Sequence, residues 1–134
     1  MKALGLILFA SCLIFACKNN EVVPNSLTGK WRLISKEVSQ NDTIKWQNLP
    51  STDSVFLFFS KYGEVVNSTG FLTQCGPASL KINGIMHRIK FHSEPANDPF
   101  AVLCAECLTW NIELQETEMI LYRCSPNRMK FTRE

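Results

Sequence analysis

Residues 108–115 read LTWNIELQ, and apolar and polar side chains alternate at every step of this stretch. Successive side chains of a β-strand point to opposite faces, so strict alternation predicts a strand with one buried face. We expect that face to carry Leu108, Trp110, Ile112 and Leu114.

Strand-like runs continue on both sides of this stretch. Further strands are expected at residues 31–38, 55–59, 64–66, 78–82, 85–91, 119–124 and 129–133. The sharpest turn signal is Asn83-Gly84, because this pair supplies the positive φ values of a two-residue hairpin turn. About eight strands without a helical pattern predict an all-β fold. The expected architecture is an antiparallel up-and-down barrel, whose closure removes exposed edges.

The N-terminal residues have the layout of an export signal. Lys2 precedes an uncharged apolar run that ends abruptly before Lys18. The run is shorter than the roughly 20 residues needed to span a bilayer core of ~30 Å. A charged start followed by a short apolar run is typical of a secretory signal peptide.

Ile14-Phe15-Ala16-Cys17 resembles a lipobox, the cleavage and acylation motif of bacterial lipoproteins. The resemblance implies a diacylglycerol thioether on Cys17, with fatty acyl chains such as palmitate, and removal of residues 1–16. Cys12, after Ala10-Ser11, is a second candidate, and plain secretion is a third reading. Residues 17–26 then form a lipidated polar tether and residues 27–134 one domain. In such lipoproteins an Asp after the anchor retains the protein at the inner membrane. Lys18 stands in that place, so we expect an outer-membrane or other envelope location, periplasmic or surface-exposed.

The overall charge is nearly balanced. The chain has 14 basic and 12 acidic side chains, and one of the basic ones, Lys2, belongs to the signal. This balance gives no reason to expect nucleic acid or anionic lipid headgroups as partners. The oligomeric state is left open.

Four cysteines remain beyond the anchor: Cys75, Cys104, Cys107 and Cys124. An even number in an exported chain favours disulfide bonds, and three connectivities are possible. A hairpin turning at Gln115-Glu116 would place Cys107 opposite Cys124 and leave Cys75 for Cys104. The spacing of Cys104 and Cys107 also allows a zinc half-site or a redox pair. Both are less favoured, because no helix follows the pair and the other two cysteines are isolated.

The start of the domain, Leu27-Thr28-Gly29-Lys30-Trp31, resembles the Gly-x-Trp opening of lipocalins, and the chain is similar to lipocalin-like domains of small bacterial lipoproteins. In lipocalins an Arg of the last strand packs across this Trp. The resemblance therefore implies that Arg133 covers Trp31 and closes one end of the barrel, by a contact worth about 0.5–2 kcal/mol. It also implies a small apolar ligand inside the barrel.

Residues that could carry chemistry are few. His87 and His92 are separated by an odd number of residues, so on one strand they would face opposite sides and form no joint metal site. His87 is expected to point into the barrel. We expect no enzymatic activity, because no catalytic triad or carboxylate pair can be assembled. We also expect no metal and no cofactor.

Two functions remain open. The first is an interaction module with a filled core, which would contact an envelope or host protein. Large residues that are expected to face inward favour a filled core: Trp31, Leu57, Phe59, Trp110 and Tyr122. An eight-stranded barrel can alternatively hold one small ligand. Asp42-Thr43-Ile44 and Asp53-Ser54-Val55 also resemble an O-glycosylation motif of some Gram-negative bacteria.

Overall fold

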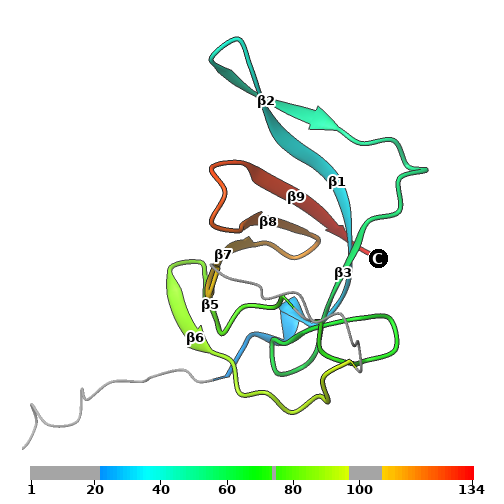
Figure 1. Ribbon diagram of the computed structural model, residues 1–134, viewed down its shortest axis with the longest axis vertical. Helices are drawn as coiled ribbons and strands as arrows, with labels where there is room; N and C mark the ends of the chain where they lie inside the picture. The colour runs from blue at the N-terminus through cyan, green and yellow to red at the C-terminus, as the bar shows by residue number, and fades with distance from the viewer. Residues whose placement is uncertain (1–21, 74, 97–106) are drawn as a thin grey trace, which may run out of the picture.

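The computed structural model describes residues 22–73, 75–96 and 107–134, which form nine β-strands and no α-helix (Figure 1). The strands are β1 (Gly29–Gln40), β2 (Thr43–Asn48), β3 (Phe56–Phe59), β4 (Val65–Val66), β5 (Ser79–Ile82), β6 (Ile85–Arg88), β7 (Thr109–Leu114), β8 (Glu118–Tyr122) and β9 (Arg128–Arg133). A short 3-10 helix, η2 (Asn25–Leu27), precedes β1.

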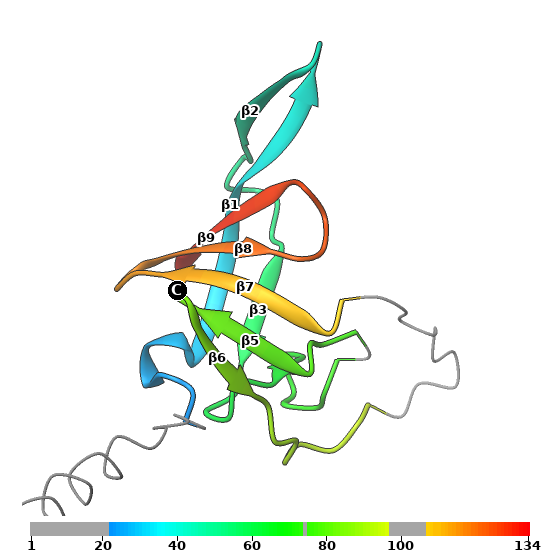
Figure 2. The ribbon, with the colours of Figure 1, turned by 90° about the vertical axis from the view of Figure 1, so that its left-hand side faces the viewer.

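All nine strands belong to one strongly curled sheet, which forms a half-barrel (Figure 2). Eight strands follow the order β4-β3-β1-β9-β8-β7-β5-β6, and β2 pairs with the second half of β1. The first strand and the last one are therefore neighbours. Every pairing is antiparallel except that of β5 with β7, which is parallel.

The expected up-and-down antiparallel barrel is corrected in two respects. The chain leaves β6 and returns to start β7 beside β5 in the same direction, and such a parallel pairing requires a long crossover. The chain between the end of β5 and the start of β7 is 26 residues long and includes β6. The sheet also stays open, because no strand pairing in the described ranges joins β4 to β6.

The core side chains follow the alternation of the strands. In β7, Trp110 and Ile112 are buried while Asn111 and Glu113 are exposed. Leu108 was expected to face inward, but it lies before the strand begins and is 70% exposed. The predicted Asn83-Gly84 hairpin is present, with φ of 47° at Asn83 and 87° at Gly84.

The interior of the half-barrel is occupied by side chains. Fully buried residues include Leu27, Trp31, Leu80, Ile112, Met119 and Leu121. Burying an aliphatic or aromatic side chain contributes about 1.5–3 kcal/mol. The core cluster and all nine strands lie between Val23 and Arg133, so a chain without residues 1–16 keeps every described element.

One buried carboxylate links the two ends of the open sheet. Glu64, just before β4, is 0% exposed. It accepts hydrogen bonds from the hydroxyls of Ser60 (2.7 Å) and Ser93 (2.9 Å). The backbone N–H groups of His92 and Ser93 (2.9 Å) also donate to it. His92 and Ser93 belong to the segment that follows β6, so Glu64 spans the gap between the ends of the sheet.

The hydrogen bonds keep Glu64 ionised. Burial by itself would raise the pKa of this carboxyl, but the hydrogen bonds from Ser93, His92 and Ser60 outweigh burial and hold the pKa below its ordinary value of 4.5. A carboxyl whose pKa is lowered by folding stabilises the protein above its unfolded pKa. That contribution is lost as the pH falls through the folded pKa.

Glu64→Gln should therefore destabilise the protein at pH 7 by about 1.5–3 kcal/mol, since the amide loses charge-assisted hydrogen bonds. The difference from the wild type should begin to shrink below pH 4.5, where the carboxyl of the unfolded chain becomes protonated, and should be lost as the pH falls through the lower pKa of the folded state. Urea unfolding at pH 7 and at a pH below 4 measures both effects. Glu116→Gln, in the exposed turn after β7, is the control and should change little. A difference that stays constant with pH would contradict the assigned role of the carboxylate.

Candidate functional site: the β1–β2 hairpin

The outer part of the β1–β2 hairpin projects from the domain (Figures 1 and 2). The pairing of β1 with β3 covers residues 29–32, and that with β9 ends at Lys36. Beyond Lys36, β1 pairs only with β2. This protruding hairpin, residues 37–46, is therefore a two-stranded ribbon, and at its base Glu37 and Trp46 contact Arg128 of β9.

The turn of the hairpin explains why the sequence did not reveal β2. Gln40 and Thr43 are paired, so the loop is Asn41-Asp42, with φ of 49° and 60°. Both values fall in the left-handed region, which Asn and Asp tolerate better than other non-glycine residues. Asn-Asp is a weaker hairpin signal than Asn-Gly, and no strand was predicted at residues 43–48.

The hairpin exposes large apolar side chains. All six residues of β2 are exposed, including Ile44 (57%) and Trp46 (41%). These two residues are two positions apart, so they share one face of the ribbon. Isolated two-stranded hairpins are marginally stable in water, and an apolar pair on such a ribbon adds nothing to the core.

A β-bulge sets the orientation at the base of the hairpin. Leu33 pairs with Phe131 in the core, and the register of β1 against β9 then shifts between Leu33 and Ser35. Lys36 consequently pairs with Met129, which places Glu37 opposite Arg128. Without the bulge, Glu37 would share the core face of Leu33.

Glu37 and Arg128 form a close ion pair at this base. Arg128 donates from its backbone N–H (2.9 Å) and from Nε (2.7 Å) to the Glu37 carboxylate, and Nη2 lies 2.5 Å from Oε1. These hydrogen bonds lower the pKa of Glu37 and raise that of Arg128, so both groups stay charged. The guanidinium also lies 5.3 Å from the ring centroid of Trp46 and 5.9 Å from that of Tyr122. Arg128 thus ties the hairpin to the sheet.

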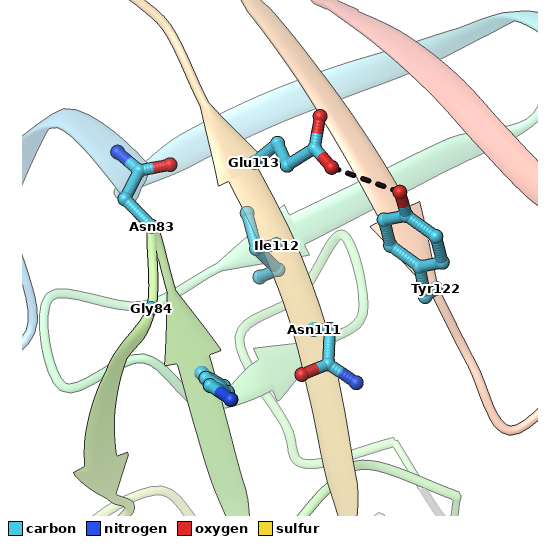
Figure 3. A pocket seen from close by; sticks show the side chains of 7 residues that line it. Asn83, Gly84, Asn111, Ile112, Glu113 and Tyr122 are labelled. Carbon is cyan, nitrogen blue, oxygen red and sulfur yellow. Dashed lines mark hydrogen bonds between the residues drawn. The ribbon is translucent and has the colours of Figure 1, made fainter.

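A shallow groove continues from this base across the outer face of the sheet, the face opposite the core. It has a volume of about 360 Å³ and is lined by Lys81, Asn83, Gly84, Asn111, Ile112, Glu113 and Tyr122. Figure 3 shows Asn111 and Tyr122 on adjacent strands, with the Tyr122 hydroxyl donating to Glu113 (2.8 Å). Tyr122 was expected to face inward, and the structure places it on the outer face, where it pairs with Arg128 and Asn111.

The cysteines were predicted only in part correctly. The Cys107–Cys124 disulfide is present, with 5.5 Å between the Cα atoms. The reason given for it was wrong: Asn111 pairs with Tyr122, so the hairpin turns one residue later and Thr109 comes opposite Cys124. Cys75 is disulfide-bonded as well. Cys104, its expected partner, and the anchor candidates Cys12 and Cys17 lie outside the described residues.

Arg133 and Trp31 make the contact that the lipocalin resemblance implies. The guanidinium carbon lies 4.7 Å from the centroid of the Trp31 ring. Arg133 also donates to the carbonyl oxygens of Thr28 (3.0 Å) and Ser26. The indole Nε1–H of Trp31 donates to the Leu27 carbonyl (2.8 Å). The pair therefore holds the η2 segment against β1.

The histidines lie in different surroundings. His87 is buried, and its Nδ1 has no hydrogen-bond partner. His92 lies beyond the end of β6 and is exposed. No three His, Cys, Asp or Glu side chains in the described ranges gather as metal ligands. Both O-glycosylation-like motifs, residues 42–44 and 53–55, are exposed.

No protein-family model, curated protein or solved structure matches this chain. The described part of the chain contains no helix that is long and apolar enough to cross a membrane.

Replacing Arg128 by Ala should loosen the hairpin while the core stays closed. The amides of Val38 and Lys45, which pair across the ribbon, should exchange with solvent at least about tenfold faster. Amides of the core strand β7, such as that of Ile112, should keep their protection. Lys130→Ala, which removes an exposed ion pair with Glu118 from the same strand, is the control. Equal acceleration throughout the sheet would show that Arg128 stabilises the whole domain and not the hairpin.

Proposed function

We propose that this protein is a lipid-anchored envelope lipoprotein whose domain is a protein-interaction module that binds its partner through the β1–β2 hairpin. The observation that carries the proposal is the exposed pair Ile44 and Trp46 on a two-stranded ribbon that projects beyond the pairing of β1 with β9. The lipobox-like residues 14–17 support the anchor. The Gly29-x-Trp31 opening and the Trp31–Arg133 contact support kinship with lipocalin-like lipoproteins.

The free edge of β2 offers a second means of recognition. Across a two-residue turn, Gln40 and Thr43 form a hydrogen-bonded pair, so the next such pair is Val38 with Lys45. The N–H and C=O groups of Ile44 and Trp46 then point away from β1. A partner strand can pair with these groups, while its side chains contact the exposed apolar ones.

The chemistry of the hairpin fits a protein partner. Trp and Arg are enriched among the residues that contribute most to protein–protein binding. Trp46 and Arg128 are in contact here, and Arg128 is already held in place by Glu37. A preformed aromatic–guanidinium pair loses little side-chain entropy on binding.

The other function that the sequence allows, a carrier of an apolar ligand inside the barrel, has less support. Its site would lie on the inner face of the sheet, where Trp31, Met119 and Leu121 are fully buried in the core cluster. The hollows of 320–390 Å³ in the described structure are lined largely by exposed residues.

The anchor predicts a specific chemical modification. Metabolic labelling of the native organism with palmitate should mark the wild-type protein, and Cys17→Ala should abolish the label, because the thioether requires the Cys17 thiol. Cys12→Ala is the matched control and should remain labelled. Label that survives Cys17→Ala would refute lipidation at this residue.

The hairpin predicts a site-specific partner. A photoreactive phenylalanine analogue at position 44 of the full-length protein should form one adduct in intact cells, whereas the same analogue at exposed Gln115 should not. Trp46→Ala in the same chain should weaken the purified complex by at least about thirtyfold, the size expected of a dominant interface residue. An adduct of twice the chain mass would identify a second copy as the occupant. Equal adducts at positions 44 and 115, or none at 44, would refute the proposal.

A further inference from the structure

A second groove lies where the chain enters the domain, at the end opposite the protruding hairpin (Figure 2). We call it the basic groove. Its volume is about 390 Å³, and its lining residues are Val22, Val23, Asn25, Lys61, Tyr62, Arg88, Lys90 and His92. These residues come from three segments: the one that precedes η2, the turn between β3 and β4, and the end of β6 with the residues after it.

The lining is strongly one-sided in charge. Four of the lining residues are basic types and none is acidic. Among the described carboxylates close in sequence to the lining, Glu64 is buried and engaged by four hydrogen-bond donors. Glu21, which precedes Val22, lies outside the described residues. Glu94 lines a different hollow with Phe71. The groove is therefore a local positive region in a chain whose overall charge is nearly balanced, and it would attract an anion.

The groove is also preorganised. The rings of Tyr62 and His92 stack, with 3.7 Å between their centroids and 15° between their planes. Lys61 Nζ lies 5.0 Å from the Tyr62 ring centroid. The backbone N–H of His92 is fixed by Glu64, so the carboxylate that closes the open sheet also positions this wall.

The hydrogen bond of His92 determines its tautomer. Nδ1 lies 2.6 Å from the carbonyl oxygen of Lys90. A carbonyl oxygen only accepts, so Nδ1 carries the proton and donates it. Nε2 is then the ring nitrogen left to contact a ligand, beside the donors of Lys61 and Arg88.

We propose that the basic groove binds the phosphate group of an anionic phospholipid in the membrane that carries the anchor. Arg88 and Lys61 supply the charged N–H donors that phosphate oxygens accept best. Val22, which is 77% exposed, is an apolar side chain beside these cations; Val23 also lines the groove but is 4% exposed and belongs to the core. A lipid headgroup presents the same combination of an anionic phosphate and adjoining apolar chains.

The position of the groove favours lipid over a free phosphate ester. Val22 follows Cys17 by five residues, which span at most about 18 Å when fully extended. With Cys17 acylated, the groove lies within reach of the headgroups, and the protruding hairpin points away from the bilayer. This choice of ligand rests on the proposed anchor, whereas the phosphate chemistry rests on the groove alone.

Vesicle binding without the anchor tests the proposal. The mature chain with Cys17→Ser carries no lipid, so the result is independent of acylation. It should co-sediment with phosphatidylcholine vesicles that contain phosphatidylglycerol at least about tenfold better than with phosphatidylcholine alone, since each basic residue near an anionic surface adds about fivefold. Lys61→Glu/Arg88→Glu should abolish this preference. The control Lys36→Glu/Lys45→Glu, at exposed positions of β1 and β2, has the same net charge and should retain the preference.

Chemical shifts of the wild-type protein separate the sources of phosphate. Vesicles with phosphatidylglycerol should shift the amides of Tyr62, Arg88 and His92, and inorganic phosphate alone should shift them only weakly. Strong shifts with inorganic phosphate and no vesicle preference would assign the groove to a soluble phosphate compound and overturn the lipid proposal. An equal loss of binding in both double variants would show nonspecific attraction and overturn the site. If the groove variant does not fold, Lys61→Gln with the same readouts replaces it.

Discussion

The Glu64 carboxylate is the constraint on which the shape of this domain depends. A sheet that curls only halfway leaves two unpaired edge strands with a gap between them, and here the edge strands are β4 and β6. A buried charge in that gap is tolerated only when it is fully hydrogen-bonded. Ser60, His92 and Ser93 satisfy this requirement from both sides, and two isolated bridges through Leu72 continue the connection. The same bonds fix the wall of the basic groove.

The distribution of side chains follows from this architecture. The described interior is filled, and both proposed binding sites therefore lie on the surface. An apolar, aromatic hairpin projects at one end, and a basic groove lies at the other, beside the segment through which the chain enters (Figure 2). Arg128 holds the first feature to the sheet and Glu64 supports the second. Each surface depends on one buried carboxylate that accepts several hydrogen bonds: Glu37 at the base of the hairpin and Glu64 beside the basic groove.

Strand periodicity is local, and it was therefore predictable. The runs around Trp110 and around Asn83-Gly84 formed the expected strands because each depends on near neighbours. The parallel pairing of β5 with β7 depends on the long connection between them, residues 83–108, and no local sequence pattern predicts the direction in which β7 pairs. Tyr122 was assigned to the wrong face because it is one position from the buried Leu121, and neighbouring residues of a strand face opposite sides. Leu108 was misplaced because it precedes the first residue of β7. The hydrogen bonds of Glu64 with Ser93 and the proximity of Lys61 to Arg88 join residues that are distant in the sequence, so no local pattern predicts them. The net charge of the chain also gives no sign that Lys61 and Arg88 lie together.

The pairing of β1 with β9 has a consequence for the way the chain becomes folded. The first strand of the domain finds one of its two central neighbours only in the last residues, so Trp31 meets Arg133 across nearly the full length of the domain. Contacts so distant in sequence make folding slow, because the entropy of closing a long loop precedes any gain from packing. A chain that is threaded across a membrane from its N-terminus, as the proposed export requires, thus cannot complete its sheet prematurely. In the proposed export, the sheet is completed only after the last strand, β9, has crossed the membrane.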